Sequence, residues 1–156
     1  MLDSTKDNPG VIAFPPLILL VSGVLSVLVH LLVRWRITPS HLAPSLGTVV
    51  IVLAVTLAGS ALRVMRAAGT SIDPAKPSLT VVRSGPYRFT RNPMYLALCL
   101  LQVALGLIVN DWITLLFVIP LAIVLHYGVI LREERYLGRK FGEPYLALKR
   151  DVRRWL

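Results

Sequence analysis

The sequence predicts an all-α integral membrane protein with four transmembrane helices and a C-terminal cytoplasmic helical segment. Of its 156 residues, 55% are hydrophobic and only 16% are charged, and the mean hydropathy is +0.68. A soluble domain of this length carries charge on about a quarter of its residues. The missing charge excludes an ordinary water-soluble fold, and the length predicts a single domain.

The four expected spans are apolar runs that are long enough to cross a bilayer. The first covers residues 14–33 and, at about 1.5 Å per residue, crosses a hydrocarbon core of about 30 Å. The lack of a small-residue cleavage site after it favours an uncleaved anchor over a signal peptide. The other spans are expected at about residues 46–65, 94–109 and 113–131.

Turns and breaks are expected in the second half of the chain. Only residues 110–112 connect the last two spans, which predicts a tight antiparallel hairpin. Pro120 lies inside the fourth span and is expected to bend it, because proline lacks the N–H that a helix needs. Further on, Pro144 is expected to open a short basic helix that runs to Trp155 along the cytoplasmic leaflet.

The basic residues lie mostly on one side of this topology. With four spans, the N-terminus, the loop at residues 63–93 and the C-terminal tail share a side. Fifteen of the 17 Lys and Arg residues fall in these segments: Lys6; Arg63, Arg66, Lys76, Arg83, Arg88 and Arg91; Arg132, Arg135, Arg139, Lys140, Lys149, Arg150, Arg153 and Arg154. By the positive-inside rule both termini are expected in the cytoplasm.

The net charge of +9 therefore indicates membrane orientation and contact with anionic lipid, and no nucleic-acid partner is expected. The single cysteine, Cys99, excludes a disulfide framework and a cysteine-rich metal site, so no metal is expected either.

The first of two polar cytoplasmic segments is centred on the start of the third span. Asn92 is expected as the N-cap of that helix and Pro93 as its first residue. A helix N-terminus presents free N–H groups and a positive dipole end, which suit a carboxylate. Arg88 and Arg91 would either strengthen such a site or contact lipid phosphates.

Small and polar residues share faces of the first three spans. In the third span Tyr95, Cys99, Gln102 and Gly106 recur at helical spacing. Such faces indicate helix packing in membranes, and Gln102 is expected to hydrogen-bond a neighbouring helix. The same is expected of Ser22, Ser26 and His30 in the first span and of Thr56, Gly59, Ser60 and Arg63 in the second. Tyr95, which lies nearest the cytoplasm, is the ligand candidate.

The second polar segment follows the fourth span. Glu133 and Glu134 form an adjacent acidic pair in the most basic part of a chain with only eight acids. They could simply neutralise neighbouring arginines, in exposed pairs of little energetic value. However, Glu133 lies two helical turns after His126, on the same face, and a carboxylate at the membrane boundary predicts a site for a cationic ligand.

A set of motifs follows in order through residues 83–156, nearly half of the chain. They are Gly85-Pro86-Tyr87-Arg88, Arg91-Asn92-Pro93-x-Tyr95, a hydrophobic hairpin, Glu133-Glu134-x-x-Leu137, Phe141-Gly142-x-x-Tyr145 and a basic tail. In this order they resemble the isoprenylcysteine carboxyl methyltransferase and phospholipid methyltransferase superfamily of integral membrane enzymes. Asn92 replaces the histidine that is usual in the eukaryotic carboxyl methyltransferases, so the resemblance is to a bacterial-type member.

The resemblance implies S-adenosylmethionine as methyl donor, bound at the cytoplasmic face by about residues 83–95 and 126–156. The cofactor's carboxylate would suit the N–H groups and arginines near Asn92, and its ammonium or ribose hydroxyls would suit Glu133 or Glu134. The lipophilic acceptor is expected to enter laterally from the bilayer. The expected cofactor-binding residues are Tyr87, Arg91, Asn92, Pro93, Tyr95, His126, Glu133, Glu134 and Tyr145.

The expected reaction is in-line methyl transfer from the sulfonium to a nucleophile of the acceptor, promoted mainly by positioning in a desolvated pocket. A carboxylate acceptor needs no base and would be held by Arg88 or Arg153. An amine, thiol or phenol must lose a proton, for which Glu133 or His126 would be the base. The catalytic candidates are therefore Glu133, Arg88 and Arg153.

Other classes of protein share parts of this pattern. Membrane sterol reductases, which use NADPH, have a similar Arg-x-Pro-x-Tyr signature but are much longer chains. A small multidrug exporter would need an acid inside the membrane, whereas every acid lies outside the four runs. A non-catalytic small membrane protein would leave the ordered motifs unexplained. The methyl acceptor and the oligomeric state stay open.

Overall fold

The computed structural model describes residues 7–74 and 76–156. Lys6, which was counted above among the basic residues, lies outside this part of the chain. Within it the chain is helical, and the single β-bridge between Arg36 and Asp111 belongs to no strand. The α-helices are α1 (Pro15–Leu32), α2 (Leu42–Ala67), α3 (Pro93–Val109), α4 (Trp112–Leu116), α5 (Val118–Leu125), α6 (Leu131–Phe141) and α7 (Glu143–Asp151), with a 3-10 helix η1 (Gly85–Arg88) and a π-helix η2 (His126–Ile130).

Three of the helical segments are long and apolar enough to cross a membrane. They are α1, α2 and the run Trp112–Phe141, in which α4, α5, η2 and α6 follow one another. The helix α3 is equally apolar but, with 17 residues, shorter. Large apolar side chains on α1, among them Leu17, Leu20, Leu28 and Leu31, are exposed, as lipid-facing residues are. The chain is therefore a multi-pass membrane protein, and the count of four spans stays a prediction.

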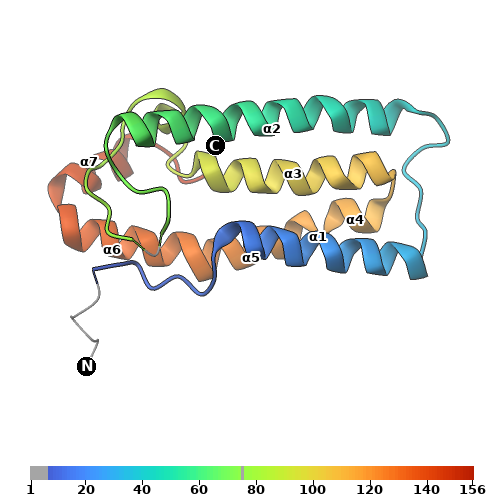
Figure 1. Cartoon of the computed structure of the whole chain (residues 1–156), viewed down its shortest axis with the longest axis horizontal. Helices are drawn as coiled ribbons and strands as arrows, with labels where there is room; N and C mark the ends of the chain where they lie inside the picture. The colour runs from blue at the N-terminus through green and yellow to red at the C-terminus, as the bar shows by residue number, and fades with distance from the viewer. Residues whose placement is uncertain (1–6, 75) are drawn as a thin grey trace.

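The helix α3 lies at the centre of the bundle. It packs against α2 on one side and against α1, α4 and α5 on the other (Figure 1). The helices α2 and α3 approach closely because α2 buries Ala43, Gly47, Ala54 and Ala61. A Cβ atom at Gly47 would lie only 2.7 Å from a side-chain carbon of Ile108, so a larger residue there would push the helices apart.

The second-span face that contains Thr56 and Gly59 does not pack within the chain, which contradicts the prediction made for it. Both residues are exposed, and a Cβ atom added at Gly59 would meet no other atom within 4 Å. The contact with α3 uses the alanines and Gly47 on another face of α2. Residues three and four apart share a helix face, so the alanines and Gly47 form a second small-residue face, and their spacing alone does not show which face is buried.

The predicted hydrogen bonds of Gln102 are confirmed. Ser22 Oγ donates to Gln102 Oε1 over 3.2 Å, and Gln102 Nε2 donates to Ser26 Oγ over 3.3 Å and to the carbonyl oxygen of Thr114 over 3.0 Å. Gln102 and Ser26 are completely buried. This polar layer joins α1, α3 and α4 halfway along the bundle.

The hairpin after α3 forms as predicted. Asn110 ends α3 in the left-handed conformation, with φ 58°, and Asp111 is the N-cap of α4. The Asp111 carboxylate accepts hydrogen bonds from Thr114 N, Thr114 Oγ1 and Trp35 N over 2.8, 3.0 and 2.8 Å. It also lies 3.3 Å from Nδ1 of His30. Asp111 therefore ties the end of α1 to the hairpin.

The long run from Trp112 is interrupted at Phe117, between α4 and α5. Pro120 is the cause, because it cannot donate to the carbonyl of Leu116, four residues earlier. The discontinuity thus lies one turn before Pro120. Further along, η2 departs from α-helical geometry, and the N-terminal segment crosses it, with Ile12 N donating to the Gly128 carbonyl over 3.2 Å.

The last helix is shorter than predicted. The helix α7 ends at Asp151, and not at Trp155, because Val152 is extended with φ −123° and ψ 135°. The chain then turns back toward the start of α3, where Arg91 N donates to the Arg153 carbonyl over 3.0 Å. The tail thus joins the segment before α3, at the same end of the bundle as α6, α7 and the loop after α2 (Figure 1).

Candidate functional site

A cavity of about 180 Å³ lies at the end of the bundle where the start of α3, the helices α6 and α7 and the loop after α2 meet. Both polar segments that the sequence singled out contribute to its wall. Eight of the nine predicted cofactor-binding residues line it: Tyr87, Arg91, Asn92, Pro93, Tyr95, Glu133, Glu134 and Tyr145. The structure thus brings together residues that are up to 58 positions apart in the sequence.

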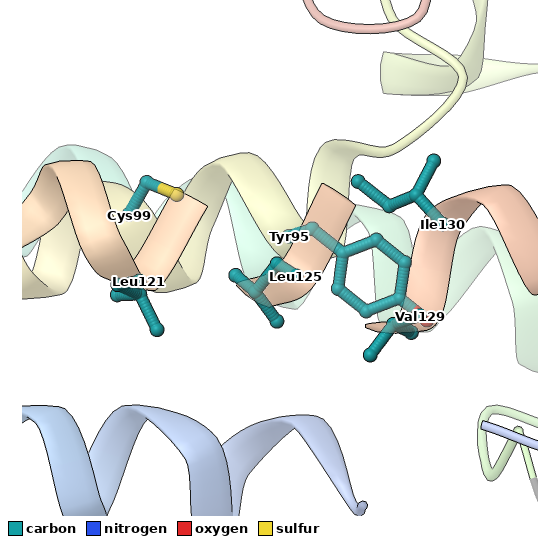
Figure 2. Packing of buried hydrophobic residues seen from close by; sticks show 6 residues of the cluster. All are labelled: Tyr95, Cys99, Leu121, Leu125, Val129 and Ile130. Carbon is teal, nitrogen blue, oxygen red and sulfur yellow. The ribbon is translucent and has the colours of Figure 1, made fainter. Parts of the chain in front are cut away.

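An apolar cluster supports the floor of this cavity. Tyr95 and Cys99 of α3 pack against residues of α5 and η2 (Figure 2). Leu125, Val129 and Ile130 are completely buried. The ring of Tyr95 is therefore fixed in the core while its hydroxyl reaches the cavity.

The first acid of the cavity, Glu133, has a single hydrogen-bond partner among the described residues. Tyr95 Oη donates to Glu133 Oε1 over 2.7 Å. Among residues 7–74 and 76–156, no basic side chain lies within ion-pair distance of the Glu133 carboxylate. Burial, and secondarily the charge of Glu133, raise the pKa of the Tyr87 hydroxyl. Glu133 therefore forms an acidic pole of the cavity that has no cation partner among the described residues.

The second acid, Glu134, is fully engaged by the chain itself. Arg154 donates from Nε to Glu134 Oε1 over 2.7 Å and from Nη2 to Oε2 over 2.9 Å. Arg91 Nη1 lies 3.2 Å from Oε1, and Lys149 Nζ lies 3.8 Å from Oε2. The hydrogen bond to Glu134 raises the pKa of Arg154. Glu134 is thus a structural anchor, and each of its two oxygens accepts a hydrogen bond from Arg154.

Arg91 forms a positive pole of the cavity. Its side chain is only 7% exposed, yet its Nε and Nη1 atoms have no hydrogen-bond partner among the described residues. Buried N–H groups without a partner cost free energy, and a guanidinium fork matches a carboxylate. Tyr145 lies beside it, and burial, followed by the charge of Glu134, raises the pKa of its hydroxyl to about 12.

The predicted N-cap behaves differently from the expectation. Asn92 holds the N-cap position, but its side chain makes no capping hydrogen bond. Its Nδ2 instead donates to the carbonyl oxygen of Arg154 over 2.9 Å, and Thr90 Oγ1 donates to the same oxygen over 3.2 Å. The N–H groups in the first turn of α3 therefore have no side-chain cap.

Three predicted site residues lie away from the cavity wall. His126 is in η2, where its ring stacks on Trp155 with the ring centroids 6.5 Å apart and 18° between the planes. Arg88 and Arg153 are exposed and do not line the cavity. The roles assigned to them from the sequence stay predictions.

Besides Pro9, Phe14, Pro15 and Pro16, which also line the cavity, two parts of the site were not predicted from the sequence. The first is Arg154, which contacts Glu134 while its neighbour Arg153 is exposed. The second is the loop after α2, whose residues Thr70–Pro74, Ser78 and Thr80–Val82 line the cavity. Leu79 N donates to Thr70 Oγ1 and Ser78 N to Tyr136 Oη, which hold this loop in place. No local motif marks the loop, because its contacts are made by backbone and small side chains.

Two comparisons with known proteins match the chain. The model of a family described as phospholipid methyltransferase matches residues 42–144. This range contains α2, the loop, η1 and the run from α3 to the start of α7. A protein of Haemophilus influenzae, described as an uncharacterized protein, is 43% identical over 63 residues, which are 40% of this chain and the whole of that protein.

Proposed function

The chain belongs to the phospholipid methyltransferase family, and we propose that it transfers a methyl group from S-adenosylmethionine to a lipophilic acceptor at the cytoplasmic face of the membrane. The observation that carries the proposal is a pair of incompletely satisfied polar groups in one cavity. Among the described residues, Glu133 has no cation within ion-pair distance, and the buried Nε and Nη1 of Arg91 have no hydrogen-bond partner. A ligand that carries both an anionic and a cationic group would satisfy both poles.

The amino-acid end of S-adenosylmethionine carries these groups. Arg91 and the uncapped N–H groups of α3 would hold its carboxylate, and Glu133 would hold its ammonium. When bound, the cofactor supplies an electrophilic methyl group on a sulfonium. The protein's own contribution is to fix both ends of the ligand and to keep water out with the aromatic and apolar wall.

A second, apolar cavity supports entry of the acceptor from the bilayer. It has a volume of about 570 Å³ and lies between α1 and α3, lined by Pro16, Leu19, Leu20, Gly23, Val24, Val27, Leu28, Leu101 and Leu105. Pro16 lines both cavities. A hydrocarbon chain in the second cavity would therefore end beside the first.

The acceptor group is a carboxylate, an amine or a thiol. A carboxylate attacks the methyl group without losing a proton. For an amine or thiol, the Glu133 carboxylate is the base that lies in the cavity wall, and the hydrogen bond from Tyr95 fixes its orientation. His126 does not line this cavity, which favours Glu133 of the two bases considered.

The proposal includes four spans with both termini in the cytoplasm. The loop after α2, the segment before α1 and the basic helices α6 and α7 gather at one end of the bundle (Figure 1). Arg34 and Arg36 lie in the connection at the opposite end. This arrangement fits the positive-inside rule when α3 is counted as a span.

Titration calorimetry of S-adenosylhomocysteine against the purified protein tests the cofactor. We expect saturable binding, and thermal stabilisation by this ligand but not by NADPH. Stabilisation by NADPH alone would instead indicate the reductase class. Incubating membranes with radiolabelled S-adenosylmethionine and extracting the lipids would then identify the acceptor.

A further inference from the structure

We propose that Arg154 is a positioning residue of the cofactor site, which keeps the Arg91 guanidinium free for the ligand's carboxylate by occupying Glu134. This inference rests on the proposed function, because it concerns how the same cavity binds S-adenosylmethionine. Arg154 need not touch the ligand in order to act. It determines whether the guanidinium of Arg91 binds the Glu134 carboxylate or the carboxylate of the ligand.

The competition follows from the geometry of the Glu134 carboxylate. A carboxylate offers two oxygens, and the fork of Arg154 takes one with each of two hydrogen bonds, of 2.7 and 2.9 Å. Arg91 Nη1 lies 3.2 Å from Oε1 but makes no hydrogen bond. Glu134 therefore attracts Arg91 by charge while its own hydrogen-bonding capacity is directed toward Arg154.

Arg91 consequently keeps donors for another anion. Its Nε and Nη1 are buried and have no hydrogen-bond partner in the described part of the chain, and the residue lines the cavity. If Arg154 were removed, both Glu134 oxygens would be open to these N–H groups. A buried carboxylate and a guanidinium 3.2 Å apart would form a direct hydrogen-bonded pair, and the ligand's carboxylate would lose that donor.

The position of Arg154 is itself fixed by the start of α3. Its carbonyl oxygen accepts hydrogen bonds from Thr90 Oγ1 and from Asn92 Nδ2. The preceding carbonyl, of Arg153, accepts from Arg91 N over 3.0 Å. On the other side Trp155 packs against the apolar cluster beneath the cavity. These contacts on both sides of Arg154 therefore fix its position relative to Arg91.

The test compares two ligands that differ by one carboxylate. One is S-adenosylhomocysteine, and the other is its decarboxylated analogue, which keeps the adenosine, the sulfur and the amine. We expect Arg154→Ala to weaken binding of S-adenosylhomocysteine by on the order of tenfold and to leave the affinity for the analogue unchanged. If Arg154 had only a structural role, Arg154→Ala would weaken the binding of both ligands to the same extent.

Four further variants complete the design. Arg91→Ala should show the same ligand selectivity, and the double variant should bind no more weakly than Arg91→Ala alone, because Arg154 acts through Arg91. Arg154→Lys keeps the charge without the fork and should restore part of the affinity. It also serves as the test variant if Arg154→Ala does not fold. Arg150→Ala, which breaks an exposed pair with Glu143 on α7, is the matched control.

The outcomes separate this inference from the proposed function. If wild-type protein binds S-adenosylhomocysteine but Arg154→Ala binds it equally well, or loses both ligands equally, the positioning role is overturned and the proposed function stands. Additive losses in the double variant would also overturn it. If wild-type protein binds neither ligand, the proposed function fails and the inference fails with it.

Discussion

Acids lie at both ends of the bundle, and their surroundings are opposite. Asp111, which is completely buried, accepts three hydrogen bonds and has His30 beside it. Glu133, in the cavity at the other end, accepts one hydrogen bond from Tyr95 and has no cation among the described residues. A buried charge that the protein satisfies contributes to the structure, whereas one left unsatisfied costs stability and indicates a ligand.

Glu134 shows that the distinction does not follow from position alone. It is adjacent to Glu133 and lines the same cavity, but Arg154, Arg91 and Lys149 surround it. In this respect Glu134 resembles the distant Asp111 more than its neighbour. Substitutions whose effects on stability and on ligand affinity are measured separately therefore test whether each acid contributes to the structure or to ligand binding.

The largest effect is expected from Asp111→Ala. This change removes the cap of α4 and the acceptor for Trp35 N and leaves buried donors without a partner. We expect the free energy of unfolding to fall by about 3 kcal/mol, as measured by thermal unfolding in detergent. The affinity of the folded fraction for S-adenosylhomocysteine should not change. Asp151→Ala, at an exposed acid, is the control and should cost less than about 0.5 kcal/mol.

Glu133→Gln should give the opposite result. The amide keeps the shape but loses the charge, so binding of S-adenosylhomocysteine should weaken by about 30-fold, or about 2 kcal/mol. The melting temperature should stay the same or rise, because a half-buried carboxylate that has no cation among the described residues is removed. The same substitution at the exposed Glu143 should change neither quantity. A loss of stability without a loss of affinity would mean that Glu133, like Asp111, contributes to the structure and not to ligand binding.

Much of this arrangement could be predicted from the sequence. Apolar runs placed the long helices, since a bilayer demands about 20 uncharged residues whatever their packing. The Asn92-Pro93 pair marked the start of α3, because proline has a fixed φ and no N–H. Periodicity identified the polar layer at Gln102, because few neighbours inside a membrane can satisfy an amide.

Which of two adjacent residues of the same type forms a tertiary contact could not be predicted. Glu133 and Glu134 have the same chemistry, and only the return of the tail decides which of them is paired. Likewise Arg154 points at Glu134 while Arg153 is exposed, because the carbonyl groups of the tail pair with Arg91 N and Asn92 Nδ2. Such register is set by tertiary hydrogen bonds between segments about 60 residues apart, which leave no periodic signal.

A smaller effect on ligand affinity is expected from a change at Tyr95, where the apolar cluster meets the cavity. Tyr95→Phe keeps the buried ring and removes the hydroxyl that donates to Glu133. The carboxylate then loses its orientation, and we expect the affinity for S-adenosylhomocysteine to fall by about threefold to tenfold. Tyr127→Phe, at an exposed tyrosine of η2, is the matched control. If Tyr95→Phe left affinity and turnover unaffected, the hydrogen bond to Glu133 would have no part in the site.

The smallest effect on ligand affinity is expected from Gln102→Leu in the polar layer. Interhelical hydrogen bonds in membranes contribute on average about 0.6 kcal/mol each, and Ser26 Oγ keeps its bond to the Gly23 carbonyl. Because Gln102 makes three such bonds, we expect the free energy of unfolding to fall by about 2 kcal/mol. Affinity for S-adenosylhomocysteine should be unchanged, because this layer lies away from the cavity wall. Weaker ligand binding by this variant would mean that the two polar regions are coupled through α3.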